Sequence, residues 1–580
     1  MRLRTLALAV PVALALAVHL PSVRNGFMGD DFFLVLGNPQ ITEPGHLRAA
    51  LTSDWFDTGR ASFIGYWRPT LKLCQRALYA WFGPWPPPFH LWMVLTHALA
   101  VGALASVLLQ LGGPLIALLG AGLFAVHPTT VEAVCMISGP GDVMAGAFVL
   151  LAAALHLRWR RTRRPALLCG VLLSAAVAVT SKESAVLLPV VLFGVSLADG
   201  AGARAALVES AGGFGVAVAA IALRLSFLAR MPLPNALGLL SPARKLLASL
   251  AALGGYPGAL WAGTTIVRLP QLPAGLDAHV VLGLLLLSGA AAVWLVKRGK
   301  GVEPFAVVLG AAGFAPVLAV WLLHIPSGAL EIPIAERWAY LPAAAASVLT
   351  ASLLARLQPR LAFGLAGVIA LFYAVLAVDR GHAYFDDRAF ERHTLEEYRA
   401  VPESELSEAA RLRKVYYEAQ EAREAGKPDE ARALYEKGKQ LAPYVPGARL
   451  KLAQLALDAD QPQEAERQLL PIFAPDYRSA AAVQQRAAHN DDVLTRYPSR
   501  PHELLGRAYA LQKRFPEAAR ELGRAAQLET DPGHRAILKF LQGAALENAG
   551  DKAGAAKAYT ESAALDPGFP APQDRLRALR

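Results

Sequence analysis

Apolar residues divide the chain into two parts. From about Leu6 to Val378, apolar runs of about 20 residues follow one another, whereas from about Asp379 to Arg580 such runs stop and charged residues become dense. A run of about 20 apolar residues matches the roughly 30 Å hydrocarbon core of a bilayer. We therefore predict an all-α chain with a polytopic membrane domain over 1–380, a linker over 381–407 and a soluble domain over 408–580.

Eleven apolar runs are predicted to cross the membrane, and the first is expected to stay uncleaved because no small-residue cleavage site follows it. The runs are 5–22, 89–110, 114–128, 143–157, 166–181, 185–198, 208–228, 279–296, 304–323, 338–355 and 361–378. A further apolar stretch, 244–263, is interrupted by GGYPG, which favours a re-entrant or interfacial segment over a twelfth crossing.

Positive charge between the runs predicts their direction. The basic connectors are Arg2 and Arg4, 158–164 (RWRRTRR), Arg204, 297–300 (KRGK), and Arg356 and Arg360. With eleven spans, all of these connectors fall on one side, which the positive-inside rule makes cytoplasmic. The same topology places the first loop (24–88), the segment 331–342 and the C-terminal domain on the extracytoplasmic side.

The C-terminal domain contains internal repeats. Segments 430–443, 464–475, 517–528 and 554–567 share an Ala-centred helix, with an insertion around 476–495. In three of them a small residue precedes the key alanine by 12 positions: Ala453 to Ala465, Gly506 to Ala518, and Gly543 to Ala555. Small residues let paired helices pack closely, and 504–528 resembles the tetratricopeptide consensus. We expect a tetratricopeptide-repeat α-solenoid with a peptide-binding groove, rather than a generic array of helical hairpins.

Charge and cysteine content exclude several classes of function. Much of the basic charge behind the net +11 lies in connectors between spans, so no nucleic-acid-binding patch is predicted. The three cysteines, Cys74, Cys135 and Cys169, are scattered and indicate neither a disulfide framework nor a metal cluster. No glycine-rich nucleotide loop or metal-ligand spacing is present, so no cofactor is assigned and a divalent metal has no support.

Ionisable residues gather at span ends on the predicted extracytoplasmic side. Asp30 and Asp31 lie in the first loop, within GFMGDDFFLVLGNPQI. The others are His127, Glu132, Asp142, Lys182, Glu183, Glu336 and Arg337. In the plainest interpretation the acid pair forms a turn and the other residues pair to lock span ends. Such positions are nonetheless functional candidates, and acids beside cations suit an anionic, lipid-linked substrate.

Five motifs resemble those of the transmembrane and tetratricopeptide-repeat-containing (TMTC-like) proteins. They are FMGDDFFLVLGNPQI in the first loop, GLFAVHPTTVEAVCMISGPGDVMAGAFVLLA, SKESAVLLPVV, AERWAYLPAAA, and YFDDRAFERHTLEEY after the last span. With the C-terminal repeats, the resemblance covers nearly the whole chain. It departs at Pro140–Gly141, where the family usually has Gly-Arg, and it is weak over 241–277.

The resemblance implies the GT-C fold of polytopic glycosyltransferases related to protein O-mannosyltransferases. It implies a polyprenyl-phosphate sugar donor, for instance of mannose, and an inverting attack by a Ser/Thr hydroxyl of an exported protein. Asp30 would be the base, with Asp31 orienting the acceptor or sharing that role. Lys182 and Arg337 would hold the donor phosphate. The remaining substrate-contacting candidates are His127, Glu132, Asp142, Glu183 and Glu336.

Two alternatives stay open: a non-catalytic membrane-anchored tetratricopeptide scaffold, and a GT-C enzyme that glycosylates a glycan or lipid. The clustered ionisable residues favour an enzyme, because an anchor needs none of them. Heavy use of Ala, Arg, Gly and Leu indicates a GC-rich, bacterial genome, so the active face would be periplasmic; in a eukaryote it would face the ER lumen. The expected partners are a polyprenyl-phosphate sugar, membrane lipids and a peptide acceptor, with no nucleic acid.

Overall fold

The computed structural model describes residues 2–57, 66–228, 242–263, 275–323, 335–406, 408–479, 482, 497–529 and 531–579, which form helices and no strand. Two compact units divide the chain: Met1–Ile325 with Glu331–His393, and Pro326–Leu330 with Thr394–Arg580. Parts of three predicted features, namely 58–65 of the first loop, 331–334 and most of the insertion at 476–495, lie outside the described residues.

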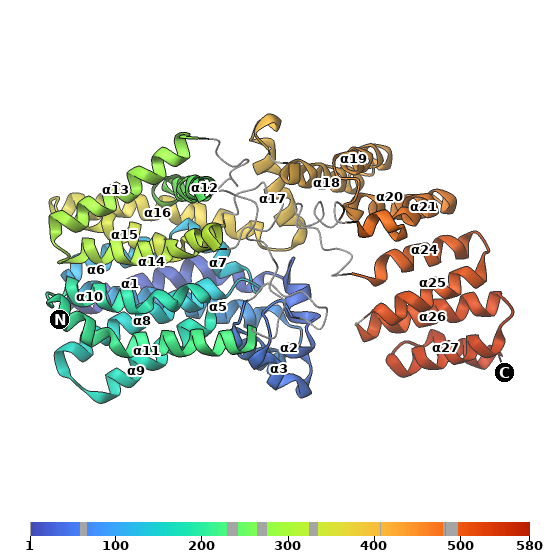
Figure 1. Cartoon of the computed structure of the whole chain (residues 1–580), viewed down its shortest axis with the longest axis horizontal. Helices are drawn as coiled ribbons and strands as arrows, with labels where there is room; N and C mark the ends of the chain where they lie inside the picture. The colour runs from blue at the N-terminus through green and yellow to red at the C-terminus, as the bar shows by residue number, and fades with distance from the viewer. Residues whose placement is uncertain are drawn as a thin grey trace. The chain divides into compact units, whose positions relative to one another are not determined.

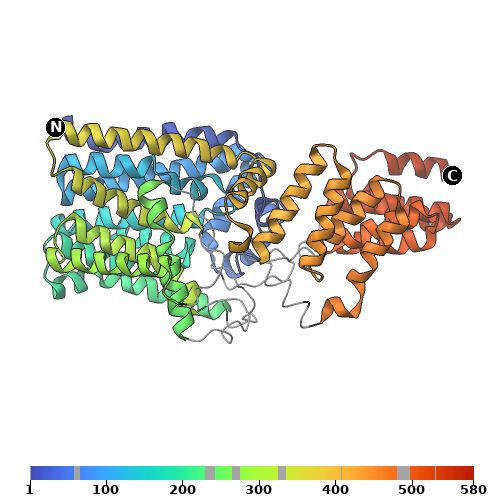
Figure 2. The same ribbon diagram turned by 90° about the horizontal axis from the view of Figure 1, so that it is seen from above.

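Each predicted span of the first unit lies on a helix. The helices are α1 (Arg2–His19), α5 (Pro86–Leu111), α6 (Gly113–Ala125), α8 (Gly141–Thr162), α9 (Pro165–Ser181), α10 (Leu188–Ala198), α11 (Ala203–Leu228), α13 (Ala278–Lys297), α14 (Val302–Leu323), α15 (Tyr340–Leu354) and α16 (Pro359–Ala383). Figures 1 and 2 show them running along a common direction within the unit.

Within the described residues, six of these helices are long and apolar enough to cross a membrane: α1, α5, α8, α11, α13 and α16. Helix α6 forms a seventh if it is joined to the residues that follow it, across a bend of 54°. Helices α9 and α10 and the segment Val302–Ala315 of α14 are apolar but shorter. The chain is therefore an integral, multi-pass membrane protein, and the count of eleven crossings stays a prediction.

The stretch 244–263 is a broken helix. Helix α12 (Pro242–Gly254) ends at the GGYPG interruption, and a short turn, η6 (Gly258–Ala262), follows. Helix α12 packs backbone to backbone on α13: a Cβ added at Gly283 would lie 2.1 Å from the carbonyl oxygen of Leu250. Neither α12 nor η6 is long enough to span a bilayer, which agrees with a segment that does not cross.

Three of the predicted basic connectors meet at one end of the bundle. Arg160 pairs with Asp199 and Glu209, and Lys297 and Arg356 both pair with Glu303. A backbone hydrogen bond of 3.1 Å from the Gly301 nitrogen to the Ala198 oxygen joins these two groups. Three of the predicted connectors thus lie at one end of the bundle, and the assignment of all of them to the cytoplasmic side stays a prediction.

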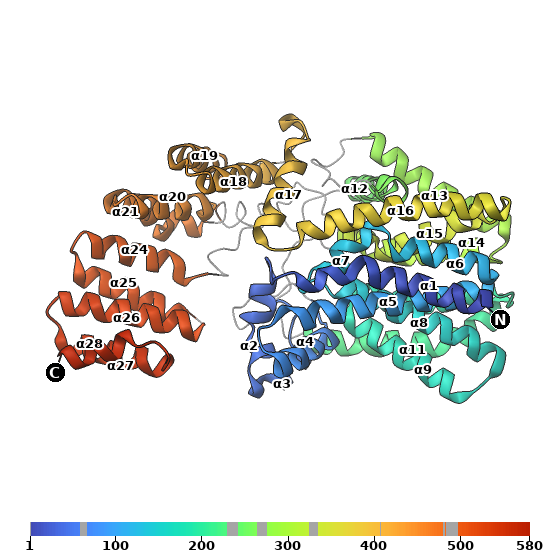
Figure 3. The ribbon, with the colours of Figure 1, turned by 180° about the vertical axis from the view of Figure 1, so that it is seen from behind.

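The first loop is folded rather than extended. Its described helices are α2 (Pro39–Thr42), α3 (Leu47–Thr52) and α4 (Pro69–Phe82), which gather at one end of the unit in Figure 3. The fully buried Lys72 amine of α4 donates to Gln40 Oε1 at 2.5 Å, Ser53 Oγ at 2.8 Å and the Asp54 carbonyl at 2.6 Å. Because burying an ammonium group without such acceptors is costly, Lys72 ties the pieces of this loop together.

The second unit is a chain of helices, each packed on its neighbours in sequence. They are α18 (Glu408–Glu424), α19 (Pro428–Leu441), α20 (Pro446–Asp458), α21 (Pro462–Leu469), α24 (Ser499–Leu511), α25 (Phe515–Leu528), α26 (Pro532–Asn548), α27 (Lys552–Leu565) and α28 (Ala571–Leu579). The predicted linker contains one helix that the sequence analysis missed, α17 (Asp387–Arg399), which crosses the boundary between the units.

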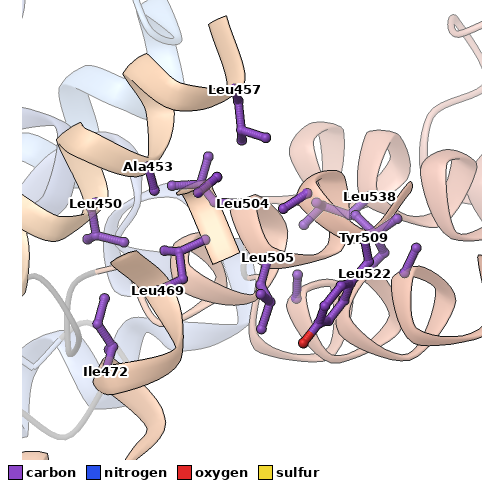
Figure 4. Packing of buried hydrophobic residues seen from close by; sticks show 14 of the residues in the cluster. Leu450, Ala453, Leu457, Leu469, Ile472, Leu504, Leu505, Tyr509, Leu522 and Leu538 are labelled. Carbon is purple, nitrogen blue, oxygen red and sulfur yellow. The ribbon is translucent and has the colours of Figure 1, made fainter. Parts of the chain in front are cut away.

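Buried small residues recur in each hairpin of this unit, always 12 and 16 positions before two buried residues of the next helix. The sets are Ala419, Ala431 and Tyr435; Ala453, Ala465 and Leu469; Gly506, Ala518 and Leu522; and Gly543, Ala555 and Tyr559. A Cβ at Gly506 would lie 2.7 Å from Leu522 Cγ, so the helices touch there. Figure 4 shows Ala453, Leu469 and Leu504 in the core between two hairpins. The close packing is as predicted; the tetratricopeptide name stays a prediction.

Candidate functional site

Asp31 anchors the first loop to the segment that follows α6. Its side chain is fully buried, and Oδ1 accepts from the backbone N–H of Ser138 at 2.6 Å. Its Oδ2 accepts from the backbone N–H of Met28 at 3.1 Å. Burial raises the pKa of Asp31 to about 7, although these two hydrogen bonds favour the charged form. Asp31 is therefore built as a structural acceptor rather than as a group open to a substrate.

Asp30 occupies the turn beside it and is only partly buried. Its carbonyl oxygen accepts from the backbone N–H groups of Phe33 at 3.1 Å and Leu34 at 2.7 Å, which starts the following helical turn. The carboxylate is thus carried on backbone that is fixed on both sides. Of the acid pair, Asp30 is the member that an incoming hydroxyl group could reach.

The post-membrane motif YFDD lies against the same turn. The backbone N–H of Gly26 donates to the carbonyl of Phe385 at 2.9 Å, and that of Gly29 donates to Asp387 Oδ1 at 2.6 Å. Gly29 has a φ of +50°, a conformation in which a side chain would be strained. Two motifs that are more than 350 positions apart in sequence therefore form one surface around Asp30.

Two ion pairs connect the other predicted residues. Lys182, just after α9, pairs with Asp142 in the first turn of α8, and Arg337 pairs with Glu132. The backbone N–H of Arg337 also donates to Glu132, at 2.8 Å. The pairs are neighbours, because Asp142 acts electrostatically on both Lys182 and Arg337. Burial lowers the pKa of Lys182 despite the opposing effect of Asp142.

Arg68 is a member of this cluster that was not among the predicted site residues. Its guanidinium binds Glu183 through Nε at 3.1 Å and Nη2 at 2.9 Å, and lies 4.6 Å from the centre of the Tyr66 ring. It also interacts with Asp142 and Lys182. Arg68 lies within the first loop, just before α4 and away from any span end, so the span-end signal that marked the other residues does not apply to it.

The last two predicted residues lie at the edge of this cluster and hold backbone in place. Glu336 pairs with Arg380, which also donates to the carbonyl of Gly263 at 2.7 Å. His127 has partners at both ring nitrogens: Nε2 at 3.0 Å from the Leu260 oxygen and Nδ1 at 2.9 Å from Thr129 Oγ1. Both residues therefore position the broken α12–η6 segment. In the described part of the chain, no three His, Cys, Asp or Glu side chains are grouped to hold a metal ion.

Comparison with known proteins gives two sequence relatives. The chain is 32% identical over 177 residues to Protein O-mannosyl-transferase Tmtc1 of Drosophila melanogaster, a match covering 30% of this chain and 21% of the fly protein. It is 33% identical over 139 residues to Protein O-mannosyl-transferase TMTC1 of Mus musculus, covering 23% and 14%. The chain resembles the TMTC protein O-mannosyl-transferases. The match thus spans about a fifth of the length of the fly relative, and no family model matches.

Two solved structures are also similar. ArnT from Cupriavidus metallidurans, bound to undecaprenyl phosphate, aligns over 90% of this chain and 80% of its own, with 13% identity and a TM-score of 0.38. The archaeal oligosaccharyltransferase AglB from Archaeoglobus fulgidus, in complex with an inhibitory peptide and a dolichol-phosphate, aligns over 69% and 58%, with 14% identity and a TM-score of 0.41.

Proposed function

We propose that this chain is a membrane glycosyltransferase that moves a sugar, such as mannose, from a polyprenyl-phosphate donor to Ser or Thr hydroxyls of exported proteins. One observation carries the proposal. Asp31 binds the backbone of Ser138. The next residue, Gly139, lies against Arg337, because a Cβ added at Gly139 would lie 3.7 Å from Arg337 Cδ. One short loop thus holds the acid pair next to a cationic cluster. The relatives named O-mannosyl-transferases support the same chemistry.

In the proposed reaction, Asp30 accepts the proton of the acceptor hydroxyl as its oxygen attacks the anomeric carbon of the donor. The bond from that carbon to the phosphate oxygen breaks with inversion, and the polyprenyl phosphate leaves with one more negative charge. The proton neutralises Asp30, so charge is conserved. Asp31 keeps the turn in place through its two backbone hydrogen bonds.

The leaving phosphate gains charge in the transition state, and the cluster offers cations to meet it. Lys182, Arg68 and Arg337 each have an acidic partner, so in the resting protein their charge is balanced. A phosphate that arrives among them competes with these carboxylates, which remain next to it and limit how tightly the product is held. We assign donor-phosphate binding to Lys182 and Arg337, with Arg68 as an addition.

The sidedness of the reaction is part of the proposal. In the proposal Asp30 faces the extracytoplasmic side, because the positive-inside rule assigns the basic connectors to the cytoplasm. Helical repeats of the second unit would then engage the acceptor polypeptide on the same side.

Glycoproteomics of exported proteins tests the proposed function. We compare cells that carry the wild-type chain with cells that carry Asp30→Asn or no copy. Hexose on Ser/Thr that depends on the wild-type chain, and is absent with Asp30→Asn at equal protein level, is the expected result. Identical hexosylation in all three strains would contradict the proposal, and loss of a lipid-linked glycan instead would identify a glycan or lipid acceptor.

A further inference from the structure

A hollow of about 670 Å³ opens between the turn that joins α8 to α9 and the start of α11. Arg163 and Glu209 line it together with Val208 and with residues 202–205, which begin α11. Helices α9 and α11 pack on each other beside it (Figure 1). The hollow lies at the end of the bundle with the basic connectors, because Glu209 pairs with Arg160 there. The proposed sugar transfer gives it no role.

The carboxylate that lines the hollow, Glu209, is already neutralised. Arg160 Nε donates to it at 2.6 Å, and Arg163 Nη2 pairs with its other oxygen. Arg163 keeps 57% of its side chain exposed, and its guanidinium lies 4.7 Å from the centre of the Trp159 ring. Because a guanidinium group carries several N–H donors in a fixed fork, Arg163 has donors left for a second anion while it holds Glu209.

Arg204 supplies the positive charge that remains. It is exposed in the first turn of α11, and in the described part of the chain it has neither an ion pair nor a hydrogen-bond partner. Of the residues that line the hollow, two are arginines and one, Glu209, is acidic. Since Glu209 is held by Arg160 and Arg163, an anionic group is the complementary occupant.

The position of the hollow favours a lipid over a soluble anion. Ala203–Phe227 is long and apolar enough to cross a membrane, so its first residues lie at the membrane surface. Val208, which lines the hollow one turn after Arg204, has 68% of its surface exposed. At a rise of about 1.5 Å per residue, Val208 lies roughly 6 Å further into the span. A phospholipid matches both levels, because its phosphate lies at the membrane surface and its acyl chains extend inward.

The backbone at the start of α11 leaves room for a headgroup. Gly202 lines the hollow, and a Cβ added there would meet no atom within 4 Å. Ala203 and Ala205, which also line it, project only a methyl group each. The arginines therefore border open space, which a phosphate group can enter.

We propose that this hollow binds the headgroup of an anionic phospholipid in the leaflet at the end with the basic connectors. Arg163 and Arg204 hold the phosphate, and Val208 contacts the start of an acyl chain. Basic pockets between membrane helices bind anionic headgroups in this way, and the cytoplasmic leaflet is the one rich in anionic lipid. The inference does not rest on the proposed glycosyl transfer, because no residue of the hollow belongs to the cluster around Asp30.

The test uses the full chain, stripped of lipid in detergent micelles. Thermal unfolding is followed while phosphatidylglycerol, phosphatidylcholine or soluble glycerol 3-phosphate is added. We expect a rise in Tm that saturates with phosphatidylglycerol and is absent with the other two. Equal rises with both lipids would overturn the proposal, because the phosphate charge would not be recognised. An equal rise with glycerol 3-phosphate would also overturn it, because the occupant would then be a free anion.

Arg204→Gln tests the charge of the hollow. An arginine near an anionic membrane surface contributes about 1 kcal/mol, so the apparent affinity for phosphatidylglycerol should fall about fivefold. Arg360→Gln is the matched control. Arg360 is also exposed and is also the second residue of a spanning helix, α16, but it does not line the hollow. The control should bind this lipid like wild type. Equal weakening in both variants would mean that the lipid responds to basic charge in general, and the site would be refuted.

Gly202→Leu tests the space of the hollow while both arginines stay in place. The added side chain occupies the headgroup position, so the affinity for phosphatidylglycerol should fall at least as far as in Arg204→Gln. Gly215→Leu, on the same helix and also facing open space, is its control and should leave the affinity unchanged. Without added lipid, the Tm of each variant is compared with that of wild type to show that it folds. If Gly202→Leu binds phosphatidylglycerol as tightly as Gly215→Leu, the hollow is not the binding place and the proposal fails.

Discussion

The two ends of the helical bundle in the first unit both carry ion pairs, and the most exposed of the cations lie at the end with the basic connectors. At the end with the basic connectors, Arg163 and Arg356 pair with glutamates while 57% and 59% of their side chains stay exposed. Arg160 at that end is 12% exposed, and at the end with Asp30 the side chains of Lys182, Arg380 and Arg337 are 9%, 6% and 32% exposed. Exposed pairs contribute little and suit orientation in the membrane, whereas buried pairs are costly to keep and point to function.

The acid pair shows the opposite relation on a smaller scale. Asp31 is buried and committed to two backbone amides, and Asp30 beside it is partly open. Burial alone therefore does not mark function, because a reacting carboxylate must also be accessible to a substrate. By this criterion Asp30 is the reacting carboxylate and Asp31 the supporting one. Each prediction below tests whether a group belongs to the reactive or to the supporting set.

The largest effect is expected for Asp30→Asn. General-base catalysis contributes about 10²–10⁴-fold, so turnover should fall by that factor while the melting temperature stays within about 2 °C of wild type. Asp30→Glu, which keeps the carboxylate, should retain part of the activity. Turnover is measured as sugar transfer to a Ser/Thr peptide, and the melting temperature by thermal unfolding of the same preparations. If Asp30→Asn keeps full turnover and Asp31→Asn alone loses it at normal stability, the assignment of the two acids is reversed.

Lys182→Met tests the buried pair with Asp142. Removing one partner leaves an uncompensated buried charge, and we expect a loss of about 3–5 kcal/mol in stability. The double variant Lys182→Met/Asp142→Leu removes both charges and should recover most of that stability. Activity should stay low in both variants, because the phosphate-binding cation is missing. Denaturation in detergent and single-turnover transfer are the measurements, and recovery of activity in the double variant would make the pair purely structural.

Asp31→Asn should lower the stability of the protein more than it lowers turnover. The amide nitrogen of Asn cannot accept from a backbone N–H, so one buried bond is lost at a cost of about 1–3 kcal/mol. The pH dependence supplies the sharper test. The folded pKa of about 7 lies above the ordinary value of 3.8, so the folded state holds the proton more tightly. This stabilisation is fully present below about pH 4 and is lost as the pH rises through 7. The stability gap between wild type and variant should therefore narrow from pH 4 to pH 7.5 in parallel melting curves.

Tyr340 joins the reactive end to the core of the bundle. Its hydroxyl donates to His97 Nδ1 at 2.7 Å, because Nε2 of that ring faces the Ala125 carbonyl at 3.3 Å. Its ring leaves no room at Gly146 of α8, where a Cβ would lie 2.6 Å away. Gly146→Ala should therefore displace α15 and cost about 1–3 kcal/mol. Tyr340→Leu in the same chain should reduce that penalty; strictly additive melting temperatures for the two changes would refute the contact.

Much of this architecture could be predicted from the sequence, because apolar runs dictate helices in a membrane. The pairing within the site could not. From the sequence alone, an ion pair is expected between adjacent residues such as Lys182–Glu183 and Glu336–Arg337. Neighbours in a helical turn, however, point in different directions. Lys182 instead pairs with Asp142, Glu183 with Arg68, and Arg337 with Glu132. Helix α17 was missed for a related reason: it is too polar to stand out from the charged segment around it.

The smallest effect is expected at the opposite end of the bundle, with Arg163→Gln. This guanidinium is more than half exposed, and Glu209 retains Arg160 at 2.6 Å after the change. The loss should be about 0–1 kcal/mol, with transfer activity unchanged. Raising the ionic strength should abolish even this difference, since exposed pairs are screened over about 10 Å at 0.1 M salt. Thermal unfolding of wild type and variant at low and high salt measures this difference in stability. A loss comparable to that of Lys182→Met would mean that ion pairs at both ends are equally important, and burial would then no longer distinguish the reactive end from the orienting one.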